Sequence, residues 1–316
     1  MNLLNTIHGS NFESILPKGW DMQKFFNCAN NPPESVFDRQ PFWNAMFMPI
    51  SCDNLEEFGV LMGHEIALQI KQARDAKHDL ILILPVGPMG MYKWAVYFLC
   101  RWGVECKHVH GFNMDEWADK DGNTLPADDP AAFQNAMLEA FYGPLGELTV
   151  PITQRHFATK DALPHYAEQI AALKAKGAKQ VLVYGIGRMC HVAFWEPHFA
   201  EDYATNEEWL CATHRIGANL HPLTIEQNAI TSFRSNYTLI PCFANTIGPG
   251  IIFQSDYAIG GLDGVMNRGM QWQGLSFWVT LRHGPCKAIT STFIPTLPGR
   301  MFFMKELAGP LVSDTN

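Results

Sequence analysis

Two ionisable side chains, His191 and Glu196, lie five residues apart in a segment that is otherwise apolar. A short apolar run, 181–184, precedes them and leads into Gly185 and Gly187. Such a run is typical of a strand buried on both faces of a parallel sheet, and the glycines let the backbone turn sharply at its carboxyl end. Open α/β sheets bind ligands at that end. His191 and Glu196 could act there as an acid–base pair, although a histidine near a strand end is more often a hydrogen-bonded structural residue.

A second carboxylate occupies the same kind of position. Residues 105–112 predict another strand, and the five residues that follow, 113–117, read Asn-Met-Asp-Glu-Trp. Because the carboxyl ends of neighbouring parallel strands meet at one edge of a sheet, Asp115 is expected near His191. A carboxylate and a histidine placed together suit general acid–base catalysis.

The sequence contains parts of the motifs for two other kinds of site. The glycines at 185 and 187 start like a dinucleotide-binding fingerprint, but Cys190 stands where the third glycine belongs. Cys106, His108 and His110 have side chains that can bind metal, yet alternation along a strand explains the two histidines equally well. We therefore expect neither a nucleotide cofactor nor a metal.

The apolar patterns around these residues predict alternating strands and helices. Helices are expected at 53–71, 91–101, 129–142, 159–177 and 265–281, and strands at 80–85, 105–112, 180–184, 237–244, 255–259 and 287–294. Residues 212–219 are interpreted as a polar loop. This alternation predicts an α/β fold of the Rossmann-like kind, with a mostly parallel sheet, right-handed crossovers and helices on both faces.

The first 52 residues differ from the rest of the chain. Prolines interrupt any periodicity, while many aromatic residues supply apolar surface. Disordered segments are poor in aromatic residues, so residues 1–52 are expected to pack on the core or on a partner subunit. Residues 53–316 are expected to form a single α/β domain.

Composition limits the class of partner. The chain has 316 residues, a net charge of −8 and eight scattered cysteines. It has no basic cluster for nucleic acid, no apolar run of membrane-spanning length and no amino-terminal targeting pattern. The sequence predicts a cytoplasmic protein with reduced thiols that binds a small molecule.

Three motifs, taken together, resemble the glucosamine-6-phosphate deaminase family, which is related to the 6-phosphogluconolactonases. They are residues 113–117, residues 187–197 (Gly-x-x-x-His-Val-Ala-Phe-x-Glu-Pro) and residues 213–219 (Thr-His-Arg-Ile-Gly-Ala-Asn). The resemblance covers roughly residues 55–300 and implies a metal-free isomerase and hydrolase that converts an amino sugar phosphate to a ketose phosphate and ammonia. The family also implies a homo-oligomer.

The resemblance assigns roles to individual residues. Asp115 matches the base that moves a proton between C2 and C1 of the open-chain sugar. His191 matches the histidine that assists ring opening, and Glu196 matches the carboxylate that orients it. The same resemblance implies that the substrate is contacted by Gly87, Met89, Gly90, Glu116 and Arg215.

The chain also departs from the family pattern. Met189 stands where the family has an aspartate, and the loop 85–90 is shorter than the family's phosphate loop and has no hydroxyl. Pro88 removes a backbone donor from that loop. The nearest cation to the family's later phosphate lysine is Arg268. These departures leave two alternatives: an isomerase or lactonase for a different sugar that need not be phosphorylated, and a catalytically silent sugar-binding protein.

Overall fold

The computed structural model describes residues 3–266 and 270–312 of the chain. Seven parallel strands form its main sheet, in the order β1-β10-β9-β6-β2-β3-β5. Their bounds are β1 Phe47–Cys52, β2 Leu80–Leu84, β3 Val109–Asn113, β5 Arg155–His156, β6 Lys179–Gly185, β9 Tyr257–Leu262 and β10 Gly299–Met304. The predicted α/β class with a mostly parallel sheet is confirmed.

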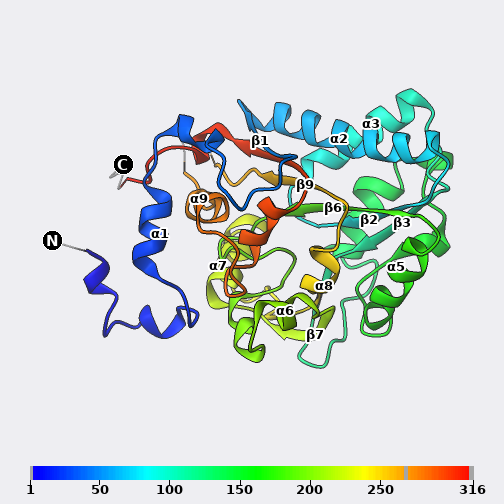
Figure 1. The fold of residues 1–316 in the computed structure, drawn as a ribbon. Helices are drawn as coiled ribbons and strands as arrows, with labels where there is room; N and C mark the ends of the chain where they lie inside the picture. Colours follow the sequence, from blue (N-terminus) through cyan, green and yellow to red (C-terminus); the bar gives the residue numbers. More distant parts are fainter. Residues whose placement is uncertain (1–2, 267–269, 313–316) are drawn as a thin grey trace.

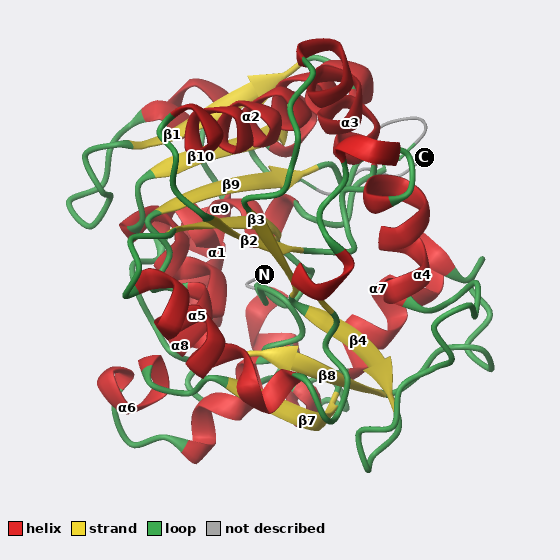
Figure 2. Cartoon of the chain, turned by 90° about the vertical axis from the view of Figure 1, so that its right-hand side faces the viewer, coloured by secondary structure: helices red, strands yellow, loops and turns green. Residues whose placement is uncertain are grey.

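Helices cover both faces of this sheet (Figures 1 and 2). The helices α2 and α3 pack together on one face, whereas α5, α8 and α9 lie on the other. The bounds are α1 Met22–Ala29, α2 Leu55–Asp75, α3 Gly90–Trp102, α4 Phe133–Met137, α5 Tyr166–Lys174, α6 Asn206–Leu210, α7 Pro222–Ser232, α8 Pro249–Ile252 and α9 Gly274–Arg282. No helix among the described residues is long and apolar enough to cross a membrane.

Local sequence explains where α2 begins and how it packs. The Asn54 side chain accepts a hydrogen bond from the Glu57 amide at 2.9 Å, and the Glu57 carboxylate accepts one from the Asp53 amide at 2.6 Å. This reciprocal pair satisfies donors that a helix start leaves free. Gly63 then lets α3 approach closely, because an added Cβ would stand 2.4 Å from the Met91 carbonyl oxygen.

A smaller antiparallel sheet packs beside the carboxyl edge of the main one. It contains β4 (Asp115–Ala118), β8 (Phe243–Ile247) and β7 (His214–Asn219), in the order β4-β8-β7. Met114 joins the two sheets, because its amide donates to the Leu84 carbonyl at 2.9 Å and its carbonyl accepts from the Ile247 amide at 2.9 Å. Asp115 therefore lies where the chain passes from one sheet to the other.

Several predicted elements are corrected by the structure. Residues 214–219 form β7 rather than a polar loop, because pairing with β8 satisfies a strand whose own pattern is polar. The segment predicted as a strand at 287–294 instead leads into a 3₁₀ helix, Thr290–Thr296. There the hydroxyl of Thr292 bonds back to the Ile289 carbonyl at 2.7 Å, a local contact that competes with strand pairing.

Two tryptophans of the amino-terminal segment donate hydrogen bonds to later parts of the chain. The indole N–H of Trp20 donates to the Ala288 carbonyl at 2.7 Å, and that of Trp43 donates to the Leu281 carbonyl at 3.0 Å. The strand β1, which lies within residues 1–52, pairs with β10 and is part of the main sheet. An edge strand of this kind carries little periodic signal of its own.

Candidate active site

A cleft of about 600 Å³ lies at the carboxyl ends of β2, β3, β6 and β9. Its lining includes the side chains of Asp115, His191 and Asp263, together with the backbone of the loop at 85–89. These groups follow four neighbouring strands, so one edge of the sheet positions all of them. This is where an open α/β sheet is expected to bind its ligand.

Asp115 is a buried carboxylate that faces the cleft. It is the first residue of β4 and lies opposite Thr246 of β8. Burial, and then the negative charge of neighbouring Glu116, raise the pKa of Asp115 well above its usual value. A carboxylate with a raised pKa is a stronger base than a solvated one, which suits it to take a proton from carbon.

His191 is held by a tight turn and by two partners. Its Nδ1 lies 3.2 Å from the Thr224 hydroxyl and 3.5 Å from a carboxylate oxygen of Glu196. The ring lies against Gly187, where an added Cβ would stand 1.8 Å from Nε2. With Nδ1 facing these two partners, Nε2 is the nitrogen left to exchange protons with a ligand.

Glu196 supports His191 from a fully buried position. One of its oxygens accepts a hydrogen bond from the His221 amide at 3.2 Å, and the other makes the ion pair with His191. Burial alone would raise the pKa of Glu196, but the charge of His191 and the donated hydrogen bonds outweigh it and hold that pKa below its usual value. Glu196 is therefore equipped to stabilise a protonated His191.

The loop after β2 contributes two of its three predicted residues to the cleft. Gly87 and Met89 line it, whereas Gly90, the first residue of α3, does not. The Met89 amide donates to the Gly87 carbonyl at 2.7 Å. That donor is thus occupied within the loop.

Two predicted substrate-binding residues are engaged elsewhere. The Glu116 carboxylate accepts hydrogen bonds from the amides of Trp117, Phe133 and Gln134 at 2.9, 2.8 and 2.7 Å, so it anchors the start of α4. Neither Glu116 nor Arg215 is part of the cleft lining. The substrate-binding role of each residue stays a prediction.

Arg215 lines a separate hollow beside β7. Its guanidinium pairs with Asp202 and lies over the ring of Phe199, 4.2 Å from the centroid. A β-bulge follows Arg215 in its pairing with β8. Such an irregularity redirects side chains, and sequence motifs give no signal of it.

Sequence reasoning missed three side chains that shape the site: Thr224, Asp263 and Gln273. Thr224 and Gln273 come from α7 and the residue before α9, which have no motif of their own. Asp263 follows β9 directly. Its place after a strand end is the same signal that identified Asp115, and it could have been found in the same way.

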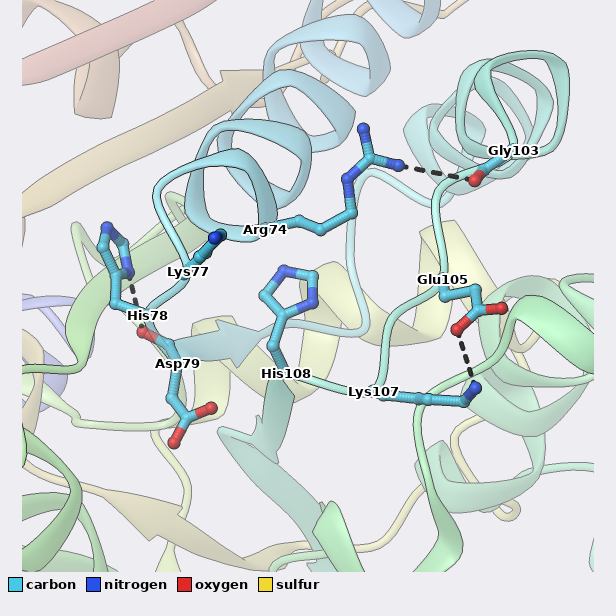
Figure 3. Close-up of a pocket in the computed structure, with 8 residues that line it drawn as sticks. All are labelled: Arg74, Lys77, His78, Asp79, Gly103, Glu105, Lys107 and His108. Atoms are coloured by element: carbon cyan, nitrogen blue, oxygen red, sulfur yellow. Dashed lines mark hydrogen bonds and ion pairs between the residues drawn. The ribbon is translucent and has the colours of Figure 1, made fainter.

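Another hollow, of about 500 Å³, lies at the opposite end of the strands, where β2 and β3 begin (Figure 3). Its charged groups are mostly engaged with the protein: Arg74 reaches the Gly103 carbonyl, Lys107 pairs with Glu105 at 2.7 Å, and the imidazole of His108 lies 2.9 Å from the Ile70 carbonyl. Among the described residues no group of histidine, cysteine and carboxylate side chains is arranged to hold a metal ion. This edge carries the amino ends of β2 and β3, so it is not the edge where the fold binds ligands.

Comparisons with known proteins agree with the motifs. No family model matches the chain. It is 28% identical to a glucosamine-6-phosphate deaminase of Caenorhabditis elegans over 198 residues, which is 62% of this chain and 68% of that protein. It is 29% identical to the Parabacteroides distasonis enzyme of that name over 46% of this chain and 53% of that protein. It is 27% identical to the Pectobacterium atrosepticum enzyme of the same name over 57% of this chain and 63% of that protein. The chain thus spans between about half and two thirds of these relatives' lengths.

Solved structures show the same fold. A monomeric glucosamine-6-phosphate deaminase of the NagB superfamily superposes with a TM-score of 0.65 at 18% identity, covering 82% of this chain and 98% of that one. A 6-phosphogluconolactonase from Shewanella baltica superposes with a TM-score of 0.53 at 16% identity, covering 83% of this chain and 98% of that one. The predicted resemblance is confirmed: the chain is a divergent relative of the glucosamine-6-phosphate deaminases.

Proposed function

We propose that the chain is a deaminating aldose–ketose isomerase that acts on an amino sugar, with Asp115 as the base and His191, supported by Glu196, as the group that opens the ring. The observation that carries the proposal is that Asp115 and His191 line one cleft at the carboxyl edge of the sheet. Its curated relatives are named glucosamine-6-phosphate deaminases.

The first step is ring opening. The Nε2 of His191 takes the proton of the C1 hydroxyl, the bond between C1 and the ring oxygen breaks, and the proton passes to that oxygen. During this transfer His191 is positively charged, and Glu196 at 3.5 Å stabilises that charge. Thr224 holds the ring so that Nδ1 stays directed away from the cleft.

The second step moves a proton from C2 to C1. Asp115 removes the proton from C2, which is acidic because it lies next to the C1 carbonyl, and returns it to C1, while the C2 ammonium group loses one proton and the C1 oxygen gains one. The amino group at C2 then becomes an iminium, and water attacks C2 and releases ammonia together with the ketose. A positioned base of this kind typically contributes about 10² to 10⁴-fold to the rate.

The proposal explains how the chain manages without the family's aspartate at position 189. Met189 is buried and faces a neighbouring hollow, where it lies with Trp20, Leu223 and Leu311. His191 is instead held by Glu196 and Thr224. His191 thus has two supporting side chains, and one of them is the Thr224 hydroxyl in place of a carboxylate.

The test is a coupled assay that measures ammonia and ketose from amino sugars, with and without a 6-phosphate. Wild type should release both products in equal amounts, and Asp115→Asn should lower the rate by at least about 10²-fold, the effect of losing a positioned base. Ketose without ammonia would mark a plain isomerase, and hydrolysis of a sugar lactone would mark a lactonase. An Asp115→Asn protein as active as wild type on every sugar would refute the assignment.

We further propose that the chain acts in the cytoplasm and assembles with copies of itself. All eight cysteines are free thiols, which suits a reducing compartment. Met46 and Met48, beside and on the edge strand β1, and Phe37 before it are more than half exposed, which suits a contact between subunits. Light scattering on the purified protein measures the mass, and a monomer at micromolar concentration would refute the assembly.

A further inference from the structure

We propose that the end of the cleft opposite Asp115 receives the terminal hydroxyl group of an unphosphorylated amino sugar, and that Asp263 is the residue that binds it. This inference rests on the proposed function and specifies its substrate class. The curated relatives carry the name of a phosphorylated sugar, so a preference for the free sugar would set this chain apart from them.

The charges in the cleft oppose a phosphate. None of the described residues that line it is a lysine or an arginine, whereas two, Asp115 and Asp263, are carboxylates. Arg188, the nearest arginine along the chain to His191, pairs with Glu226 and lines the neighbouring hollow instead. Arg268 lies outside the described residues. None of the described lining side chains would balance the charge of a phosphate dianion, and a carboxylate there would repel it when ionised.

The backbone also offers little to an anion. Phosphate sites at the start of a helix use several free N–H groups that point at the ligand. In the loop after β2, Pro88 has no N–H, and the Met89 amide already donates to the Gly87 carbonyl at 2.7 Å. Gly90 does not line the cleft. Of the amides at 87–90, only that of Gly87 is both unpaired within the described residues and on the cleft wall.

Asp263, in contrast, is built into the opposite wall. Gln273 fixes the turn that carries it: its side-chain oxygen accepts from the Gly264 amide at 2.6 Å, and its side-chain nitrogen donates to the Ile186 carbonyl at 2.6 Å. No other side chain among the described residues donates a hydrogen bond to the Asp263 carboxylate. Burial raises the pKa of Asp263.

The Asp263 carboxylate is partly buried and accepts a hydrogen bond from its own backbone amide, and its remaining acceptor positions can take a ligand hydroxyl. Carboxylates accept hydrogen bonds from sugar hydroxyls readily, and these charge-assisted bonds are short and strong. Trp272 and Met266 lie on the same wall and offer apolar surface to the carbon skeleton of the sugar. This wall therefore has the chemistry of a site for a neutral polyol.

The order of the strands separates the two ends. Asp115 follows β3 and Asp263 follows β9, with β2 and β6 between them. Neighbouring strands lie about 4.8 Å apart, so these two strands are separated by three spacings, or about 14 Å. A sugar with C1 and C2 at Asp115 would extend past His191 toward Asp263. The far hydroxyl, not the reacting carbons, is the part that Asp263 would meet.

The experiment compares glucosamine with glucosamine 6-phosphate, both for turnover and for the shift in melting temperature of the full chain. We expect kcat/KM for glucosamine to exceed that for the phosphate by at least tenfold. Asp263→Asn should raise KM for glucosamine about tenfold with kcat nearly unchanged, since a charge-assisted bond is lost away from the reacting carbons. Asp75→Asn removes an exposed carboxylate in α2 and serves as the matched control.

The outcomes separate this inference from the proposed function. Turnover of glucosamine 6-phosphate as fast as or faster than glucosamine would support the proposed function and overturn the inference. Glucosamine-dependent stabilisation that Asp263→Asn abolishes, without product from either sugar, would support the inference and refute the isomerase. If neither sugar stabilises the protein or is converted, both are refuted.

Discussion

The support that Glu196 gives to His191 can be tested by one conservative substitution. Glu196→Gln keeps the shape of the side chain and the oxygen that accepts from the His221 amide, but removes the charge 3.5 Å from the imidazole. At that separation, an effective dielectric constant of 20 gives an attraction of about 5 kcal/mol. The net loss is smaller because solvation and hydrogen bonds change together, and a charged hydrogen bond is worth about 1.5–3 kcal/mol.

This loss falls on the state in which His191 carries a proton, so it should reduce kcat more than it raises KM. The expected decrease in kcat is about 10- to 150-fold. Steady-state kinetics across a pH series, with ammonia and ketose both measured, provide the assay. Thr224→Val removes a neutral partner of the same nitrogen and should cost about 2- to 13-fold, in line with about 0.5–1.5 kcal/mol for a neutral hydrogen bond.

A Glu196→Gln protein that keeps the wild-type kcat, with an unchanged melting temperature, would refute the role of Glu196 as the group that stabilises charged His191. A loss in kcat matched by a large fall in melting temperature would instead show that the substitution damages the fold. Thr224→Val distinguishes the two explanations, because Thr224 is equally buried and contacts the same ring.

Three further predictions follow from the same geometry. Because burial gives Asp115 a folded pKa above its unfolded value, its contribution to stability is complete below the unfolded pKa and is lost as pH rises toward the folded one. Asp115→Asn should therefore match the wild-type melting temperature near pH 4 and exceed it at pH 7, although it is inactive; a lower melting temperature at pH 7 would contradict this. Glu116→Ala should lower the melting temperature, because it leaves three amides without an acceptor. Arg215→Ala should leave KM within about twofold, since Arg215 lies outside the cleft, and a tenfold rise in KM would show that it reaches the sugar.

The sequence was most informative where local pattern and position in the sheet act together. β2 and β6 are buried runs flanked by turn residues, and both form where predicted. The position of Asp115 after β3 and of His191 after β6 then followed from the general rule that parallel strands share a carboxyl edge. These residues were found because the signal for each lies within a few residues of the residue itself.

The rest depends on contacts between distant parts of the chain. β1 and β10 stabilise each other as neighbours although more than two hundred residues separate them, and neither shows a clear pattern alone. Thr224 reaches His191 from α7 across 33 positions in the chain. The local pattern of a single sequence does not show which distant residues come into contact, because packing in the folded protein decides these contacts rather than local preference.

Sequence motifs identify residues but do not give the direction of their side chains. Arg215 lies in the motif that the resemblance assigns to a substrate arginine, but its guanidinium lies over the ring of Phe199, and its pairing with β8 is irregular after this residue. Glu116 is next to the proposed base but is bound to three amides. Residue identity was retained at both places, and the direction of the side chain decided its role.

The position of Arg215 bears on the chemistry of the cleft. Arg215 is not among the described lining residues, none of which is an arginine or lysine, and Asp263 is the carboxylic acid at the end opposite Asp115. The groups proposed to move protons, Asp115 and His191, are the ones that the resemblance assigned, whereas no lysine or arginine is among the described residues that line the cleft. In the proposed binding mode, separate strand ends hold the reacting carbons and the far end of the sugar, so one end can change its specificity while the other keeps its chemistry. That separation is the physical reason to expect the family's reaction on a different sugar.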